Sequence, residues 1–221
     1  MYSYSINNVF GSNAEIAIRS ILERFFAANV NTLPKEYEYE QTDTCEDTED
    51  IYQSLNGNHE AYKRLVEKYE QAIAKTMWRF SRDELIHEEL VQDVFVEAYL
   101  SLRSFKEQAP FLHWLRKIAT RVGYRYWKEL AREHSKKHFT LQEWDEVLSQ
   151  SPEKIDSEQA GKILHYLLVT LPPRDRLVLT LRFVEGLSVE QAAYRTGWSK
   201  SMVKVQTIRA KRKLKKMFPN A

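Results

Sequence analysis

The chain has 221 residues, enough for one large domain or two small ones that each bury an ordinary core. Its net charge of +2 is unevenly distributed: residues 1–58 hold ten acidic and three basic residues, a balance of −7, so residues 59–221 carry +9. The single cysteine, Cys45, excludes an intrachain disulfide and a cysteine-based zinc finger, and is typical of a reducing cytosol. An acidic N-terminal segment followed by a basic remainder of the chain suggests a protein that binds nucleic acid.

The apolar residues are patterned for helices and not for membrane spans. No apolar run has the length of a bilayer crossing and the first residues lack a signal-peptide pattern, so we expect a cytoplasmic protein without membrane insertion. Glycine and proline are few, with six of each, and no segment alternates with period two for long. The periodic segments therefore predict an all-α fold.

Residues 1–57 are predicted to be an N-terminal extension. Its Ser12–Ala28 stretch has an amphipathic pattern that predicts a short helix docked on the body. Thr32–Asp50 is acidic and turn-rich, which predicts a flexible linker. Two interpretations of this acidic charge stay open: a disordered solubilising segment, or a cover for basic surfaces that is displaced on assembly.

Residues 58–131 predict a three-helix bundle, because apolar residues recur at spacings of three and four in three successive segments. Asn58 and Asp83 stand as N-caps, and Pro110 suits the first turn of the third helix. Residues 132–157 are polar and weakly periodic, which predicts a flexible linker between two domains.

Residues 158–221 predict a second domain of four helices that ends in a helix-turn-helix. Ser188 and Gln191 have capping-box spacing, Gly197 breaks the helix, and Ser199 can cap the next. Such a motif places its second helix in the DNA major groove, so the candidates for contacts with bases or phosphates are Ser199, Lys200, Ser201, Lys204, Val205, Gln206, Arg209, Arg212 and Lys213. A merely solvated lysine-rich helix is the alternative, but it would require neither the capped first helix nor the turn.

The third helix of the first domain interleaves aromatic and basic residues, a combination that captures unstacked single-stranded bases. The candidates are Arg116, Lys117, Arg121, Tyr124, Arg125, Trp127 and Lys128. By helical period we expect Tyr126 and Trp114 in the core. The competing interpretation is that most of these rings are core residues.

Two separate stretches resemble one family, the extracytoplasmic-function (ECF) group of bacterial sigma factors, which are promoter-reading subunits of RNA polymerase. ELVQDVFVEAYLSL, at Glu89–Leu102, is similar to the core-polymerase-binding helix of sigma region 2, and Phe105–Ala119 is similar to its promoter-melting loop and following helix. Leu171–Ala193 and the basic helix after it resemble sigma region 4, which reads the minus-35 element. Together the two resemblances cover Asn58–Met217.

The resemblance implies a non-enzymatic factor that directs promoter recognition, melting and initiation, for a stress or envelope regulon. It implies as partners the beta and beta-prime subunits of the polymerase core, promoter DNA and an anti-sigma factor, with no cofactor and no small-molecule substrate. It implies that core polymerase is bound by Glu89, Gln92, Asp93, Val96, Glu97 and Leu100. It assigns the single-strand-binding candidates of the third helix to the minus-10 element of the promoter and adds to them the loop residues Lys106, Glu107 and Gln108.

The chain departs from the family pattern at several of these positions. Val205 and Gln206 stand where the family has Ser-Arg; Val205 cannot donate a hydrogen bond, and Gln206 suits adenine. Arg121 replaces a common Asn, and Glu107 and Gln108 replace the usual Gly-Asp of the loop. We therefore expect altered preferences at both promoter elements.

Two other classes of function remain as alternatives. A helix-turn-helix regulator would bind duplex DNA as a dimer at paired half-sites without core polymerase. A helical adaptor that binds only proteins fits poorly with the +9 body. His134 and His138 have helical spacing but lack a third ligand nearby, and no catalytic motif is present, so we expect neither a metal site nor an enzyme.

Overall fold

A computed structural model describes residues 20–23, 25–26, 44–134 and 157–217. These residues are almost entirely helical and include no strand, which confirms the all-α prediction. Among them, no helix is both long and apolar enough to cross a membrane. The chain forms two compact units, one within Glu36–Leu130 and Tyr194–Gly197 and the other within Ala131–Ala193, Trp198–Ala221 and Met1–Lys35.

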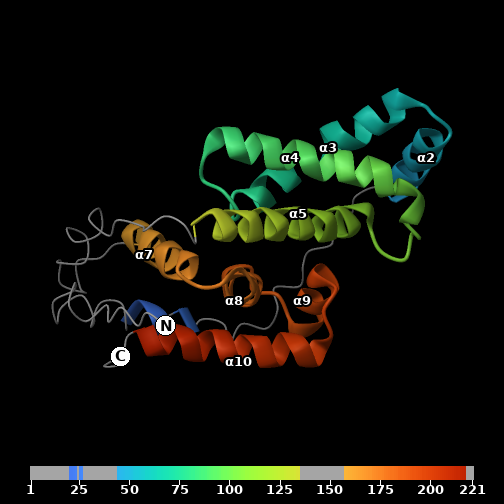
Figure 1. Cartoon of the computed structure of the whole chain (residues 1–221). Helices are drawn as coiled ribbons and strands as arrows, with labels where there is room; N and C mark the ends of the chain where they lie inside the picture. Colours follow the sequence, from blue (N-terminus) through green and yellow to red (C-terminus); the bar gives the residue numbers. More distant parts are fainter. Residues whose placement is uncertain (1–19, 24, 27–43, 135–156, 218–221) are drawn as a thin grey trace. The chain divides into compact units, whose positions relative to one another are not determined.

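The first unit contains four α-helices, one more than the sequence predicts (Figure 1). They are α2 (Thr44–Leu55), α3 (His59–Met77), α4 (Glu84–Ser101) and α5 (Phe111–His134), with the 3₁₀ turn η2 (Leu102–Ser104) after α4. The predicted caps are confirmed: the Asn58 side chain accepts hydrogen bonds from the N–H groups of Glu60 and Ala61, and Asp83 accepts one from Ile86.

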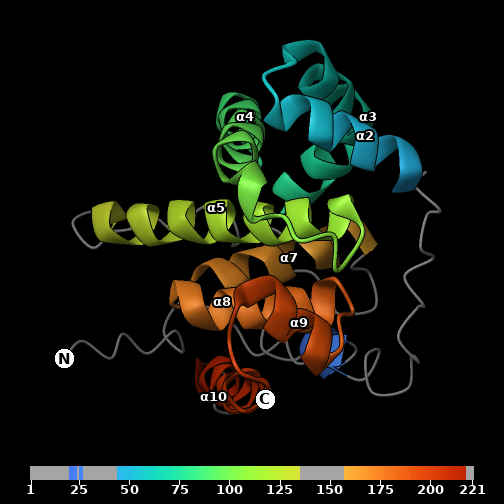
Figure 2. The same ribbon diagram turned by 90° about the vertical axis from the view of Figure 1, so that its right-hand side faces the viewer.

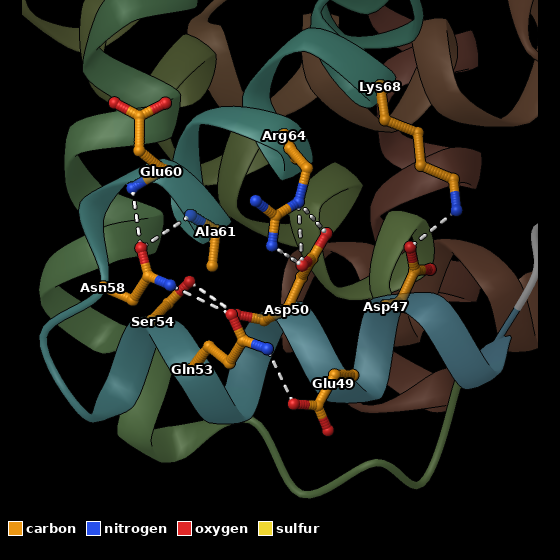
Figure 3. A network of polar contacts seen from close by, with 10 residues as sticks. All are labelled: Asp47, Glu49, Asp50, Gln53, Ser54, Asn58, Glu60, Ala61, Arg64 and Lys68. Carbon is orange, nitrogen blue, oxygen red and sulfur yellow. Dashed lines mark hydrogen bonds and ion pairs between the residues drawn. The ribbon is translucent and has the colours of Figure 1, made fainter.

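Helix α2 corrects the prediction that the acidic stretch is a flexible linker up to Asp50. Asp47, only 4% exposed, accepts a hydrogen bond from Lys68 of α3, while Asp50 pairs with Arg64 (Figure 3). Asp47 also accepts a hydrogen bond from the Tyr69 hydroxyl. The acidic residues that predict disorder are here the partners of cations on the next helix. Their charge is neutralised locally, and the first unit therefore begins upstream of residue 58.

The core of the first unit corrects the prediction for Trp127. This side chain is 2% exposed, and its indole N–H donates to the backbone carbonyl of Phe80 over 2.9 Å. The Phe80 ring lies 4.6 Å from the Trp127 ring and packs against Gly123, where a Cβ atom would meet it at 2.3 Å. A buried tryptophan needs a partner for its N–H, and here that partner is provided. Trp127 is therefore a core residue.

Within residues 157–217, the second unit forms the four predicted helices. They are α7 (Ser157–Val169), α8 (Pro173–Leu179), α9 (Val189–Thr196) and α10 (Lys200–Met217), and α8 continues into the π-helical turn η5 (Thr180–Val184). Helix α8 lies across α10 in both views (Figures 1 and 2). Between these two helices the Asp175 carboxylate, 1% exposed, accepts hydrogen bonds from Gln206 and from Lys213. This polar contact fixes α10 on the rest of the unit.

Candidate nucleic-acid and protein interfaces

The helix-turn-helix is built as the sequence predicts. The backbone N–H of Gln191 donates to the Ser188 hydroxyl at 3.1 Å, and the Gln191 side chain accepts from the Ser188 N–H at 2.7 Å, which completes a capping box. Gly197 has a φ of +73°, a conformation that glycine adopts without strain, and it ends α9. The Ser199 hydroxyl then accepts from the Met202 N–H at 3.2 Å and caps α10.

Most of the predicted minus-35 residues lie on the exposed side of α10. Val205 is 46% exposed, and Ile208, which the sequence did not single out, is 58% exposed. Lys200 pairs with Glu190 of α9 at 3.2 Å. The other exposed candidates are Ser199, Ser201, Lys204, Arg209 and Arg212. This side of α10 offers several cations around an apolar centre.

Gln206 and Lys213 are placed differently from the other candidates. Gln206 is 9% exposed, and its amide donates to Asp175, so the prediction that it reads adenine is wrong for this geometry. Lys213 is exposed, but its ammonium pairs with the same carboxylate at 2.5 Å. Both side chains hold α10 against α8, because a buried carboxylate requires hydrogen-bond donors.

Predicted single-strand-binding residues of α5 are tied to predicted polymerase-binding residues of α4. Arg121 pairs with Glu97 at 2.6 Å, and Arg125 pairs with Glu97 at 2.9 Å and with Asp93 at 3.7 Å. Lys128 lies 5.0 Å from the centre of the Tyr124 ring. Arg116 and Lys117 lie on the same helix. Two sets of residues that the sequence assigns to different partners thus neutralise one another in the free chain.

The outer side of α4 exposes apolar residues beside its acids. Val96 is 58% exposed and Leu100 is 78% exposed, while Glu89, Gln92 and Asp93 are also exposed. Leu85 is 78% exposed and Tyr99 is 38% exposed, and both extend this surface. The sequence analysis did not predict either residue as part of it, although Leu85 and Gln92, seven residues apart, lie on one helical face. We call Leu85, Gln92, Val96, Tyr99 and Leu100, with the acids between them, the α4 face.

A groove of about 670 Å³ lies between α2 and the loop that precedes α5. Its lining includes Asp47, Glu49 and Ile51 from α2, and Phe105, Glu107 and Phe111 from the loop and α5. The loop residues Lys106, Glu107 and Gln108 are exposed. Glu107 has a φ of +54°, the left-handed conformation that favours glycine. This groove could not be found from the sequence, because the prediction treats α2 as a linker.

Known protein families match parts of both units. The family described as sigma-70 region 2 matches residues 65–133, and the family described as sigma-70 region 4 matches residues 162–214. The RNA polymerase sigma-H factor of Pseudomonas aeruginosa is 30% identical over 145 residues, which cover 62% of this chain and 75% of that protein. The ECF RNA polymerase sigma-E factor of Escherichia coli strain K12 is 28% identical over 145 residues, with the same coverage of 62% and 75%.

Among solved structures, the sigma factor RpoE in complex with the anti-sigma factor NepR from Bartonella quintana is similar to 72% of this chain and 96% of its own, with a TM-score of 0.45 and 20% identity. The family assignment rests on the two matched regions, which occur in the order of regions 2 and 4, and on the curated relatives. The chain is a member of the ECF group of the sigma-70 family of RNA polymerase sigma factors.

Proposed function

We propose that the first unit binds core polymerase and the melted minus-10 strand, and that the second unit reads the minus-35 element. A sigma factor directs RNA polymerase to promoters and helps to open them, without making or breaking a covalent bond. The observation that carries the proposal is that the two sigma regions occur together on one chain, each with exposed functional residues.

The α4 face is proposed to bind the beta and beta-prime subunits of the polymerase core. Val96 and Leu100 leave large apolar areas in water, and large exposed apolar patches are typical of protein interfaces. Glu89, Gln92 and Asp93 surround them with polar groups, as expected for the rim of a helix-to-helix contact.

The first unit is also proposed to hold the melted minus-10 strand. Arg121, Arg125, Arg116, Lys117 and Lys128 supply cations along α5, and Tyr124 supplies a ring. The groove between α2 and the loop suits an unstacked base better than a phosphate, because Phe105 offers a partly exposed ring while the exposed Glu49 and Glu107 repel anions. Stacking is typically worth about 1 to 3 kcal/mol per base, which offsets part of the energy of melting.

The second unit is proposed to read the minus-35 element through the first turns of α10. Lys200, Ser201, Lys204 and Val205 are exposed there, and the N-terminal residues of a recognition helix are those that contact base edges. Val205 offers a methyl surface that fits a thymine methyl group. Arg209 and Arg212 lie farther along α10 and are proposed to contact backbone phosphates.

Two further points extend the family assignment. An anti-sigma factor is proposed as the regulator that competes for these surfaces, because sigma factors of the ECF group commonly have such a partner. The cytoplasm is proposed as the location, since the polymerase and the chromosome are there. The alternative of a dimeric regulator predicts binding to paired half-sites without polymerase.

The proposal is tested by separating closed from open promoter complexes. With reconstituted holoenzyme, Arg121→Ala should reduce permanganate reactivity of the melted strand by at least tenfold while gel-shift affinity at low temperature changes less than threefold. A paired change at Val96 and Leu100 to Ser should weaken binding to core polymerase and leave duplex DNA binding by the free chain unchanged. Equal loss in both promoter assays, or unchanged core binding, would contradict these assignments.

A further inference from the structure

The groove of the first unit has one wall built by α2, and side chains near the start of α3 position an acid of that wall. The Glu49 carboxylate lines the groove and accepts a hydrogen bond from the Gln53 amide at 2.7 Å. The side-chain oxygen of Gln53 accepts one from the Asn58 amide at 3.0 Å, and Asn58 is the N-cap of α3 (Figure 3). Two consecutive hydrogen bonds therefore tie Glu49 to the first turn of α3.

A second acid of the same wall, Asp47, is engaged with α3 through both of its carboxylate oxygens. Asp47 is 4% exposed and accepts hydrogen bonds from Lys68 and from the Tyr69 hydroxyl. Glu49 is exposed, and its hydrogen bond with Gln53 uses one of the about four lone-pair sites of a carboxylate. Of these two acids, Glu49 is therefore the one with acceptor sites left for a ligand.

Acids lie inside the groove and a cation lies outside it. Among the described residues that line the groove, none is a lysine or an arginine, whereas Glu49 and Glu107 supply exposed carboxylates. Lys106 is exposed in the same loop and does not line the groove. Phe105 lines it with a partly exposed ring. A nucleotide has the complementary arrangement, because its base is a flat ring with N–H donors and its negative charge lies on the phosphate.

The position of the groove favours a base over a basic side chain of a protein partner. Pro110 and Phe111 line the groove, and α5 begins at Phe111. The cations proposed to hold the strand follow on the same helix, of which Arg116 is five residues, or about 7.5 Å, from Phe111. A strand whose phosphates are held by these cations therefore brings its bases close to the groove.

A carboxylate distinguishes bases because it accepts hydrogen bonds and cannot donate them. Unstacked bases are recognised by stacking and by hydrogen bonds to their Watson–Crick edge. On that edge cytosine and adenine carry an exocyclic amino group, whereas thymine has the O4 carbonyl oxygen where cytosine has its amino group. An amino group donates to a carboxylate, and a carbonyl oxygen in its place is repelled. The Glu49 carboxylate therefore favours a base that carries an amino group.

We propose that Glu49 is a specificity-determining residue of the groove: its carboxylate accepts a hydrogen bond from the exocyclic amino group of an unstacked base, so that cytosine and adenine enter in preference to thymine. The inference rests on the proposed role of the first unit in holding the melted strand, and it adds which bases the groove takes. Glu49 lies before residues 65–133, which match the region 2 family, so the family match assigns it no role.

The test measures binding of the full-length chain to two labelled single strands of equal length, one of deoxycytidine and one of deoxyuridine. Uracil has O4 in place of the cytosine amino group and lacks the thymine methyl group, so the ratio of the two affinities isolates the amino group. The wild type should bind the deoxycytidine strand at least tenfold more tightly. Glu49→Gln should reduce this ratio to less than threefold, because an amide can donate to O4 as well as accept from an amino group.

Glu67→Gln is the matched control. Glu67 is exposed on α3 and does not line the groove, so this change removes the same charge from the same unit. Removal of a negative charge strengthens phosphate binding to both strands, and the ratio of affinities should stay within twofold of that of the wild type.

Three outcomes would overturn the inference, and they separate it from the proposed function. Equal ratios in the wild type and Glu49→Gln, with salt-dependent binding of both strands, would remove Glu49 from base selection and leave the strand-holding role of the first unit standing. An unchanged ratio together with weaker binding of Glu49→Gln to core polymerase would assign the groove to a basic side chain of the polymerase. Failure of the wild type to bind either strand would overturn the strand-holding role as well.

Discussion

Replacement of Glu97 by Gln tests whether the ion pairs of Glu97 hold the predicted DNA-binding arginines of α5 against the predicted polymerase-binding residues of α4. The Glu97 carboxylate pairs with Arg121 at 2.6 Å and with Arg125 at 2.9 Å. The arginine side chains are 58% and 44% exposed and that of Glu97 is 24% exposed, so solvent screens both pairs. Partly exposed pairs contribute about 0.2 to 1 kcal/mol each, so Glu97→Gln should lower the free energy of unfolding by about 1 kcal/mol at low salt. Added salt should reduce this loss.

The larger effect is expected on binding of single-stranded DNA by the free chain. With Glu97 neutral, the Arg121 guanidinium is available to phosphates, whereas Arg125 keeps its longer ion pair with Asp93 at 3.7 Å. Each phosphate neutralised on a single strand adds about 0.7 to the slope of log affinity against log salt concentration. Release of Arg121 should therefore steepen the slope by about 0.7, with tighter binding at low salt. Fluorescence anisotropy of a labelled oligonucleotide at several salt concentrations measures both quantities.

Glu88→Gln is the matched control for Glu97→Gln. Glu88 is exposed on the same helix, and no ion pair links it to another described residue. It removes the same charge without releasing an arginine, so its salt slope should equal that of the wild type. If Glu97→Gln and Glu88→Gln give the same slope and affinity, the carboxylate does not hold the arginines away from DNA, and the reasoning is refuted.

Three further changes test the packing and the DNA-reading surface. Gly123→Ala should lower the free energy of unfolding in urea by about 1 to 2 kcal/mol, because overpacking against Phe80 at 2.3 Å outweighs a gain of about 1 kcal/mol in helix propensity; stabilisation would contradict this packing. Gln206→Ala should cost about 1 to 3 kcal/mol in thermal or urea unfolding by removing a donor from buried Asp175, with DNA affinity of the folded protein within twofold of wild type; the reverse pattern would place Gln206 at a base. Arg212→Ala should leave stability unchanged and reduce the salt slope of duplex binding by about 0.9, and an unchanged slope would remove it from the phosphate contacts.

Local signals of the sequence were sufficient for the helices and the helix-turn-helix. A cap or a tight turn depends on residues within four positions of one another, as at Asn58, Ser188 and Gly197, and each of these is confirmed. The exposed side of α4 also follows from its helical period. These features require no knowledge of the tertiary contacts.

The features that the sequence could not predict depend on distant partners. Helix α2 looks disordered by composition, but Asp47 and Asp50 meet cations on α3. Periodicity favours Tyr126 over its neighbour Trp127, yet the carbonyl of Phe80, 47 positions earlier, accepts the Trp127 N–H. Gln206 has the position of a base-reading residue, but its partner Asp175 lies 31 positions away. In each case a hydrogen-bonding group became buried because tertiary structure supplied its partner.

Transcription in vitro tests the central claim most directly, namely that this chain programs polymerase for promoter-specific initiation. Purified bacterial core polymerase, with and without the chain, would be supplied with a library of genomic promoter fragments, and the RNA 5′ ends would be sequenced. The account predicts RNA with defined start sites that appear only when the chain is added. RNA from none of the fragments, together with binding of the chain alone to paired half-sites as a dimer, would contradict it.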